Sequence, residues 1–257
     1  MSRNTVRRAA AAAAWSFALC VRAVADPIPP SGPEPESASG RSPLDEPQTI
    51  LFNTTEIGAS AYFNTGFKHA LGTSLFRDGL ILMGNAGAGR QRETVALPDR
   101  RAVVDYWSSE ASLVVGYQWK TDRAVIALLA GPEVEFDQPL VDGRVLALNR
   151  PAFGARVLAE VWAHPMEDAL LAGTLVLGTA PVRAWGRAAA GWRIWGSVFI
   201  GPEAVVSVEE TYREARLGLA ATGLQVGRWT FGLSAGVLAV EGSKPGAYAG
   251  LTTVFRP

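Results

Sequence analysis

Two copies of one short motif, both downstream of the Pro-rich segment, carry the carboxylates with the clearest chemical potential. Gly131-Pro132-Glu133 and Gly201-Pro202-Glu203 each lie within a stretch in which apolar and less apolar residues alternate. Such alternation indicates a strand, with both glutamates on its less apolar face. Two carboxyl groups held about 5–9 Å apart can hydrolyse a glycosidic bond. The sequence does not place Glu133 and Glu203 finely enough to give the distance between their carboxyl groups, so we assign no catalytic role to either.

The chain has only two histidines, which limits nucleophilic catalysis and metal binding. A Ser/His/acid site, as in a membrane-embedded lipid hydrolase, would need His69 or His164. His69 follows Lys68 in a predicted loop, His164 precedes Pro165 in a predicted turn, and neither has a serine at a suggestive spacing. The single G-x-S-x-G match, Gly232 to Gly236, lies within a predicted strand and lacks the strand-to-helix turn of a nucleophile elbow. We interpret both histidines as surface residues and predict no metal site.

Neither phosphate binding nor nucleic-acid binding is supported. The segment 84–89, G-N-A-G-A-G, matches a phosphate loop only in composition, because it lacks the lysine and the following helix. The 24 basic and 24 acidic residues give a formal net charge of zero, and no basic patch with interleaved aromatic residues occurs. We therefore predict no cofactor and no nucleic-acid partner.

The N-terminus predicts export through the inner membrane. In residues 1–25, three arginines precede the apolar run 9–21, and a small-x-small cleavage site ends at Ala25. This pattern is typical of a signal peptide. The alternative is a transmembrane anchor, but the run is shorter than the roughly 20 residues that such a helix needs. The only cysteine, Cys20, lies within this segment, so we expect no disulfide in the mature protein.

Residues 26–48 are rich in proline, glycine, serine and glutamate. Such a composition buries too little apolar surface to offset the entropy of ordering. We predict a disordered or polyproline-like linker, with a partner-binding peptide as the alternative. The remaining domain is residues 49–257.

The sequence pattern of that domain predicts successive strands of about ten residues, which is the length of a tilted membrane-spanning strand. One face of each strand is nearly free of charge, whereas the other carries Glu, Arg, Ser, Thr and Gly. We predict an all-β fold, a single antiparallel transmembrane β-barrel of about 10–12 strands, apolar outside and polar inside. A soluble sandwich is the alternative, but it would be richer in lysine. The three lysines, Lys68, Lys120 and Lys244, are expected near strand ends or loops.

The predicted strands are odd in number, although bacterial single-chain barrels prefer an even number. The alternation predicts one continuous strand across residues 56–63, and the polar composition predicts a loop at residues 142–149. We expect the missing strand within 92–104. Aromatic pairs recur near strand ends, as at Trp192 and Trp195, which is the pattern of interfacial girdles.

Charged residues on the predicted inner face form a candidate polar network in the lumen. They are Glu56, Glu110, Glu133, Glu135, Arg156, Glu160, Arg183, Arg187, Glu203, Glu214 and Arg216. An unpaired buried charge is costly, so the carboxylates should pair with guanidinium groups. The first interpretation is a structural ion network that fills the lumen. The alternative is a polar conduit, or a groove that hydrogen-bonds sugar hydroxyls.

Proline and glycine add two expectations about these strands. Pro202 should bend or bulge its strand, with Glu203 held inside by an arginine such as Arg216 or Arg187. Inner glycines such as Gly116 either leave room in the lumen or mark sharp curvature.

Several short motifs resemble those of one family. They are G-A-S-A-Y-F-N-T-G-F, R-D-G-L-I-L-M-G-N-A-G-A-G, L-V-V-G-Y-Q, the repeated G-P-E and Y-R-E-A-R-L-G-L. Over residues 57–255 the sequence resembles the cellulose biosynthesis protein BcsS family of alphaproteobacteria. This resemblance implies an outer-membrane barrel associated with bacterial cellulose synthesis and secretion, and it supplies no catalytic motif.

We therefore predict a non-enzymatic outer-membrane accessory protein of cellulose (exopolysaccharide) biosynthesis or secretion. The implied partners are outer-membrane lipid, cellulose or another exopolysaccharide, and other components of cellulose secretion. The alternatives are a lipid-modifying enzyme of the small-barrel type and a general structural porin-like protein. Whether the barrel conducts, anchors or scaffolds is left open at this point.

Overall fold

The computed structural model describes residues 46–58, 60–96, 101–141, 144–145, 150–180, 182–209, 212–241 and 243–257. The predicted signal peptide, 1–25, and the linker up to residue 45 lie outside the described residues. Across the part of the chain that the structure describes, no helix has the length and hydropathy to cross a membrane.

Within the described ranges, the regular elements are all β-strands. Their bounds are β1 Thr49–Ile57, β2 Ser60–Leu71, β3 Gly79–Ala96, β4 Arg101–Lys120, β5 Ala124–Val141, β6 Arg144–Val145, β7 Ala152–Ala163, β8 Ala169–Thr179, β9 Val182–Trp195, β10 Val198–Glu209, β11 Arg213–Val226, β12 Trp229–Val240 and β13 Gly246–Phe255.

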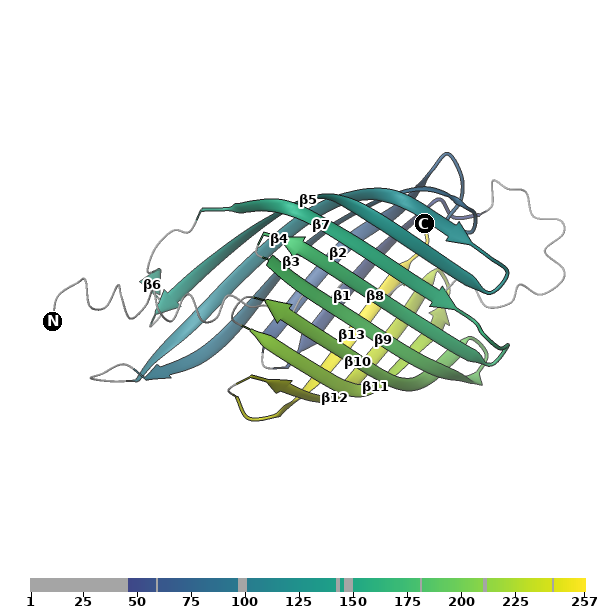
Figure 1. The fold of residues 1–257 in the computed structure, drawn as a ribbon. Coiled ribbons are helices and arrows are strands. Elements are labelled where there is room, and N and C mark those ends of the chain that lie inside the picture. The colour runs from purple at the N-terminus through teal and green to yellow at the C-terminus, as the bar shows by residue number, and fades with distance from the viewer. Residues whose placement is uncertain are drawn as a thin grey trace.

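Twelve of these strands close into one antiparallel barrel (Figure 1). Neighbours in sequence pair with each other, β1 pairs with β13, and β5 pairs with both β4 and β7. The two-residue strand β6 pairs only with the far end of β5 among the described residues. Closure leaves no membrane-buried backbone edge without a hydrogen-bonding partner, and antiparallel pairing around the whole ring requires an even number of strands. The predicted barrel and its even strand number are confirmed.

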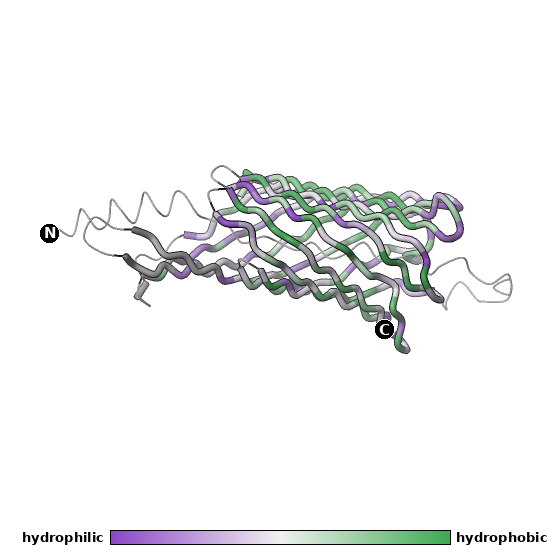
Figure 2. Tube along the Cα trace, turned by 90° about the horizontal axis from the view of Figure 1, so that it is seen from below, coloured by the Kyte–Doolittle hydropathy of each residue, from purple (hydrophilic) through white to green (hydrophobic). Residues whose placement is uncertain are grey.

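Residue alternation gives the barrel an apolar outer face. Along β4, Leu113 and Val115 are exposed while Ser112 and Val114 are buried, and the hydropathy of successive residues changes in the same way along other strands (Figure 2). Because the side chains of a strand alternate, one short sequence can meet lipid and fill the interior at once.

The missing strand lies at residues 56–63 and not at 92–104. A hairpin turn at Gly58, where the Gly58 amide donates to the Ser60 carbonyl at 2.8 Å, separates β1 from β2. Ile57 pairs with Ala61, and since paired residues have the same parity, the alternation of inward and outward side chains continues unbroken from β1 into β2. The segment 92–104 instead ends β3 and begins β4, and the predicted loop 142–149 contains β6.

Exposed aromatic residues mark two levels on the outer surface. Trp119, Trp192, Trp195 and Trp229 lie at the barrel end where β1 begins and β13 ends, which we call the terminal end. Trp107 lies on the same face of β4 as Trp119, toward the opposite end. At a rise of about 3.3 Å per residue and a strand tilt of about 40°, Trp107 and Trp119 are about 30 Å apart along the barrel axis. This distance is close to the thickness of a bilayer core.

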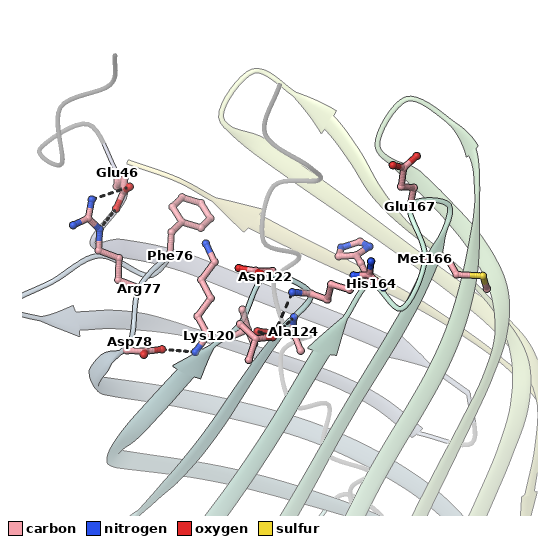
Figure 3. A pocket seen from close by; sticks show the side chains of 13 residues that line it. Glu46, Phe76, Arg77, Asp78, Lys120, Asp122, Ala124, His164, Met166 and Glu167 are labelled. Carbon is pink, nitrogen blue, oxygen red and sulfur yellow. Dashed lines mark hydrogen bonds and ion pairs between the residues drawn. The ribbon is translucent and has the colours of Figure 1, made fainter. Parts of the chain in front are cut away.

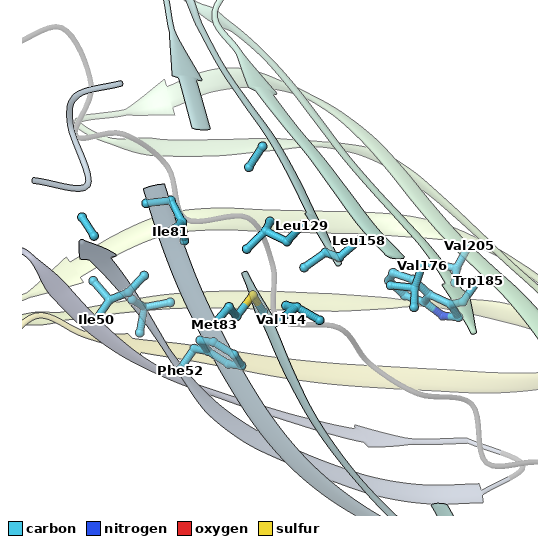
Figure 4. Packing of buried hydrophobic residues seen from close by; sticks show 13 residues of the cluster. Ile50, Phe52, Ile81, Met83, Val114, Leu129, Leu158, Val176, Trp185 and Val205 are labelled. Carbon is cyan, nitrogen blue, oxygen red and sulfur yellow. The ribbon is translucent and has the colours of Figure 1, made fainter. Parts of the chain in front are cut away.

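The interior is not polar throughout, because an inner apolar strip crosses ten strands of the barrel wall. Its members are Ile50, Phe52, Ala70, Ile81, Met83, Val114, Ala127, Leu129, Leu158, Val176, Trp185, Val205 and Val254. Leu129, Leu158, Val176 and Trp185 stand directly opposite one another on successive strands, and their side chains lie inside the barrel (Figure 4). Sequence alternation identified the lipid-facing residues but did not predict this second apolar surface.

Candidate functional site

The charged residues of the interior form two ion networks, and strand β9 contributes an arginine to each. The first ion network joins Glu110 of β4, Glu133 and Glu135 of β5, Arg156 of β7 and Arg183 of β9. Arg183 contacts all three carboxylates, at 3.1, 2.6 and 3.0 Å in that order, and Arg156 contacts Glu110 at 2.5 Å and Glu133 at 3.0 Å. All five residues are buried. The Arg183–Glu110 pair therefore ties β9 to β4 across three intervening strands.

Glu133, from the first G-P-E motif, has its acceptor positions filled. One carboxylate oxygen accepts the amides of Thr179 and Ala180 at 3.0 and 3.1 Å. The other accepts Arg156 Nε and Arg183 Nη2. A carboxylate offers about four lone-pair sites. This glutamate is thus a structural acceptor that fixes the β8–β9 turn, and it has no lone pair left for general acid–base work.

The second ion network contains Glu56, Arg187, Glu203, Glu214 and Arg216. Arg216 contacts Glu56 at 2.8 Å and Glu214 at 2.5 Å, which joins β11 to β1. Arg187 Nε donates to Glu203 at 2.6 Å, so Arg187 of β9, one of the two expected arginines, is the partner of the second G-P-E glutamate.

Buried polar side chains that were not predicted as site residues complete both networks. In the first, the Tyr62 hydroxyl donates to Glu110 at 2.5 Å, and Arg156 donates to Ser112 at 3.2 Å. In the second, Tyr212 donates to Glu214 at 2.6 Å and Tyr248 to Glu203 at 2.9 Å. Tyr62 stands on the polar face of the alternation in the sequence, so the pattern contained a signal for it.

Glu160 belongs to neither network. It pairs at 2.7 Å with Lys68, which reaches it from β2 although three strands separate β2 from β7. Glu133 and Glu203 lie in different networks and bind different arginines. The paired-carboxylate arrangement of a glycosidase therefore does not form between the two motifs.

Each G-P-E motif interrupts one side of its strand ladder without shifting the register. Residues 201 and 202 have no β9 partner in the ladder, yet the pairs on either side, Ile200 with Trp192 and Glu203 with Ala189, keep the same register. The expected bulge at Pro202 is therefore absent from this described ladder. The glycine before the proline allows β10 to approach β9 closely at this point, since a Cβ on Gly201 would lie 2.0 Å from the Ala190 carbonyl oxygen.

The inner glycines mark close approach between backbones. A Cβ on Gly116 would lie 1.9 Å from the Leu128 carbonyl oxygen, and one on Gly131 would lie 2.1 Å from that of Leu113. Of the two explanations offered by the sequence, tight curvature applies at these positions, because the space beside each glycine is filled by the neighbouring strand.

The two histidines lie apart from the ion networks. His69 was predicted in a loop but lies in β2, where its Nδ1 is 2.7 Å from the Thr49 hydroxyl. His164 does lie in a turn, where Trp162 Nε1–H donates to Nε2 at 3.3 Å and Nδ1 lies 3.3 Å from the Ala169 carbonyl. Burial lowers the pKa of His164, and the nearby Arg193 guanidinium lowers that pKa further. A neutral ring that accepts from Trp162 suits this setting.

A recess of about 780 Å³ opens at the terminal end of the barrel (Figure 3). Three turns form it, namely those between β2 and β3, between β4 and β5, and between β7 and β8. Its lining residues are Glu46, Phe76, Arg77, Asp78, Lys120, Thr121, Asp122, Arg123, Ala124, Val125, His164, Met166 and Glu167. Glu46 accepts hydrogen bonds from Arg77 and Ser74, and these bonds lower the pKa of its carboxyl group. Nothing in the sequence pattern indicated this recess, because its walls come from distant turns.

Among solved structures, the chain is similar to the transport unit of the autotransporter AIDA-I from Escherichia coli. Their TM-score is 0.51 at 8% identity, over 99% of both chains. The KdgM porin gives a TM-score of 0.49 at 10% identity, over 80% of this chain and 98% of that one. The translocator domain of the autotransporter NalP from Neisseria meningitidis gives 0.46 at 10% identity, over 81% and 88%.

The AIDA-I likeness shows the fold, which is that of an outer-membrane β-barrel. No curated protein matches the chain. The family model described as "Cellulose biosynthesis protein BcsS" matches residues 50–256, which is nearly the whole barrel. The expected family is thereby confirmed: this chain belongs to the cellulose biosynthesis protein BcsS family.

Proposed function

We propose that this protein is a non-enzymatic accessory barrel of the outer membrane that supports cellulose (exopolysaccharide) synthesis and secretion. Family membership supports the link to cellulose. The saturated coordination of Glu133 is the observation that most favours a non-enzymatic role. A carboxylate that accepts four donors holds strands together, whereas a general acid or base needs a free position within reach of its substrate.

The interior also favours an anchor or scaffold over an open conduit. Wide aqueous barrels have polar walls, but here an apolar strip crosses the wall of ten strands. An apolar constriction expels water and so opposes the passage of ions and of a hydrated sugar chain. Ion pairs from Arg183 to Glu110 and from Lys68 to Glu160 further cross-link the interior.

A deletion strain tests the accessory role. Loss of the gene in a bacterium that encodes a cellulose synthase is expected to reduce cell-surface cellulose, measured by dye binding and by enzymatic release of glucose. A His69→Ala variant should restore cellulose as well as the wild type does, because the His69 ring contacts the Thr49 hydroxyl and does not line the recess at the terminal end. Unchanged cellulose output after deletion would refute the cellulose role. Failure of the correctly assembled His69→Ala variant to complement would favour the lipid-modifying enzyme instead.

Electrical recording in a planar lipid bilayer tests whether the interior is closed to ions. The wild-type protein is expected to give no steady conductance steps, because the inner apolar strip keeps water out. Leu129→Ser combined with Leu158→Ser should raise the conductance, since both side chains stand opposite each other in the strip. The observation that would count against this prediction is a steady open channel from the wild type that the double variant does not change.

A further inference from the structure

The recess at the terminal end has the features of a binding site. Its volume of about 780 Å³ lies within the range of about 300–1,000 Å³ that is usual for ligand sites. The turns that line it are consecutive around the rim, from the β2–β3 turn to the β7–β8 turn. With strands about 4.8 Å apart, it follows the rim for roughly 15–20 Å. It is therefore elongated and suits an extended chain better than a compact ligand.

Three polar side chains of the recess are positioned by hydrogen bonds, namely those of Arg77, Asp78 and Arg123. Arg77 Nε donates to Glu46 at 3.0 Å, and Arg123 Nη1 donates to the Pro165 carbonyl at 3.3 Å. The Asp78 carboxylate accepts the backbone amide of Lys120. Preorganised donors and acceptors reduce the entropy lost when a ligand binds.

The charges of the recess favour a neutral ligand. The lining carboxylates are Glu46, Asp78, Asp122 and Glu167, and the lining cations are Arg77, Lys120 and Arg123. The two signs nearly balance, so neither an anion nor a cation gains from the overall charge. A neutral chain of hydroxyl groups can both donate to the carboxylates and accept from the cations.

An aromatic ring supplies the apolar part of the site. Phe76 lies in the β2–β3 turn with Lys120 Nζ 5.5 Å from its ring centroid, and both residues line the recess (Figure 3). A sugar ring has one apolar face and a rim of hydroxyl groups, so it fits a flat ring beside charged side chains. Specific pockets combine apolar or aromatic lining with a few fixed polar groups in the same way.

The position of the recess fits a ligand that arrives from the periplasm. The turns at this end have seven, three, five, two and two residues in chain order, whereas the longest connection of the barrel, between β5 and β7, lies at the opposite end. Short turns are the periplasmic pattern of outer-membrane barrels. The strands β3, β4 and β5 extend farthest at the opposite end.

We infer that the recess at the terminal end binds a β-1,4-glucan chain as it reaches the outer membrane. This inference rests on the proposed role in cellulose secretion, which supplies the identity of the neutral polyhydroxyl chain. Asp122 and Glu167 are the acceptors best placed for the sugar hydroxyls, because both are exposed in neighbouring turns that line the recess.

Titration with cellohexaose tests the site. The whole mature protein is folded in a zwitterionic detergent without a sugar headgroup, and binding is followed by calorimetry. The wild type should bind cellohexaose saturably and more tightly than maltohexaose. Asp122→Ala/Glu167→Ala should weaken binding by about tenfold or more, because two charge-assisted hydrogen bonds are lost. Glu241→Ala, an exposed change at the opposite mouth, is the matched control and should leave binding unchanged.

Three results would overturn the inference: no saturable binding by the folded wild type, equal binding of maltohexaose, or an unchanged affinity in the Asp122/Glu167 double variant. Each of these leaves the deletion phenotype untouched, so failure of the glucan site is distinguishable from failure of the accessory role. Heat-modifiable migration of every variant shows that the barrel is folded during the titration.

Discussion

Replacing Arg183 with alanine is expected to destabilise the barrel by about 3–5 kcal/mol, because it leaves buried carboxylates without their shared counter-ion. Arg183 contacts Glu110, Glu133 and Glu135 at 2.6–3.1 Å, and its side chain is only 4% exposed. Water cannot replace the lost guanidinium at such burial. The measurement is urea-induced unfolding in lipid vesicles, followed by tryptophan fluorescence.

The matched control for Arg183 is an arginine in an exposed ion pair. Arg213 lies 3.8 Å from Glu241, with side chains 72% and 66% exposed, so Arg213→Ala should cost about 1 kcal/mol or less. Adding Glu133→Gln to Arg183→Ala should recover part of the loss, because it reduces the excess of carboxylates around Arg156, the remaining arginine of the first ion network. Equal unfolding midpoints for Arg183→Ala and Arg213→Ala would show that the first ion network does not stabilise the fold.

Gly201→Ala is the second large effect that we expect, with assembly impaired or stability reduced by about 3 kcal/mol or more. The added methyl group would lie 2.0 Å from the Ala190 carbonyl oxygen and 2.9 Å from Gly191 Cα. Both obstacles are backbone atoms of β9, so β10 itself would have to move. The measurement is the fraction of protein that gains heat-modifiable migration on refolding.

Gly186→Ala, on the neighbouring strand β9, is the control for Gly201→Ala. Its new methyl group would have no neighbour nearer than 3.8 Å, so folding should be close to that of the wild type. Gly131→Ala, in the first G-P-E motif, should behave like Gly201→Ala, because its clash with the Leu113 carbonyl oxygen is 2.1 Å. Efficient refolding of Gly201→Ala would mean that the close approach of the two strands is not needed for closure.

The two G-P-E motifs have a common structural role in the barrel. The glycine allows its strand to approach a neighbouring strand closely, and the proline faces outward where the ladder is interrupted. The glutamate points into the barrel and pairs with an arginine. Each motif combines strand curvature with charge pairing. This common role explains why the G-P-E triplet occurs in two distant strands without forming a shared site.

The sequence alone determined much of this protein. Alternation identified the strands, the apolar outer face and the inward position of residues such as Arg183 and Glu203, because side-chain direction in a strand depends only on parity. Short motifs identified the family. Parity also explains the misplaced strand, since the turn at Gly58 leaves the in/out pattern intact.

Only the tertiary structure decided which inward residues meet. Arg183 reaches Glu110 across three intervening strands, and Lys68 reaches Glu160 in the same way, because closure of the sheet sets distances across the interior. The inner apolar strip and the recess at the terminal end likewise join residues from distant strands and turns. A local pattern determines the face of the sheet on which a side chain lies. Its neighbours across the barrel depend on register, tilt and closure together, which no single strand encodes.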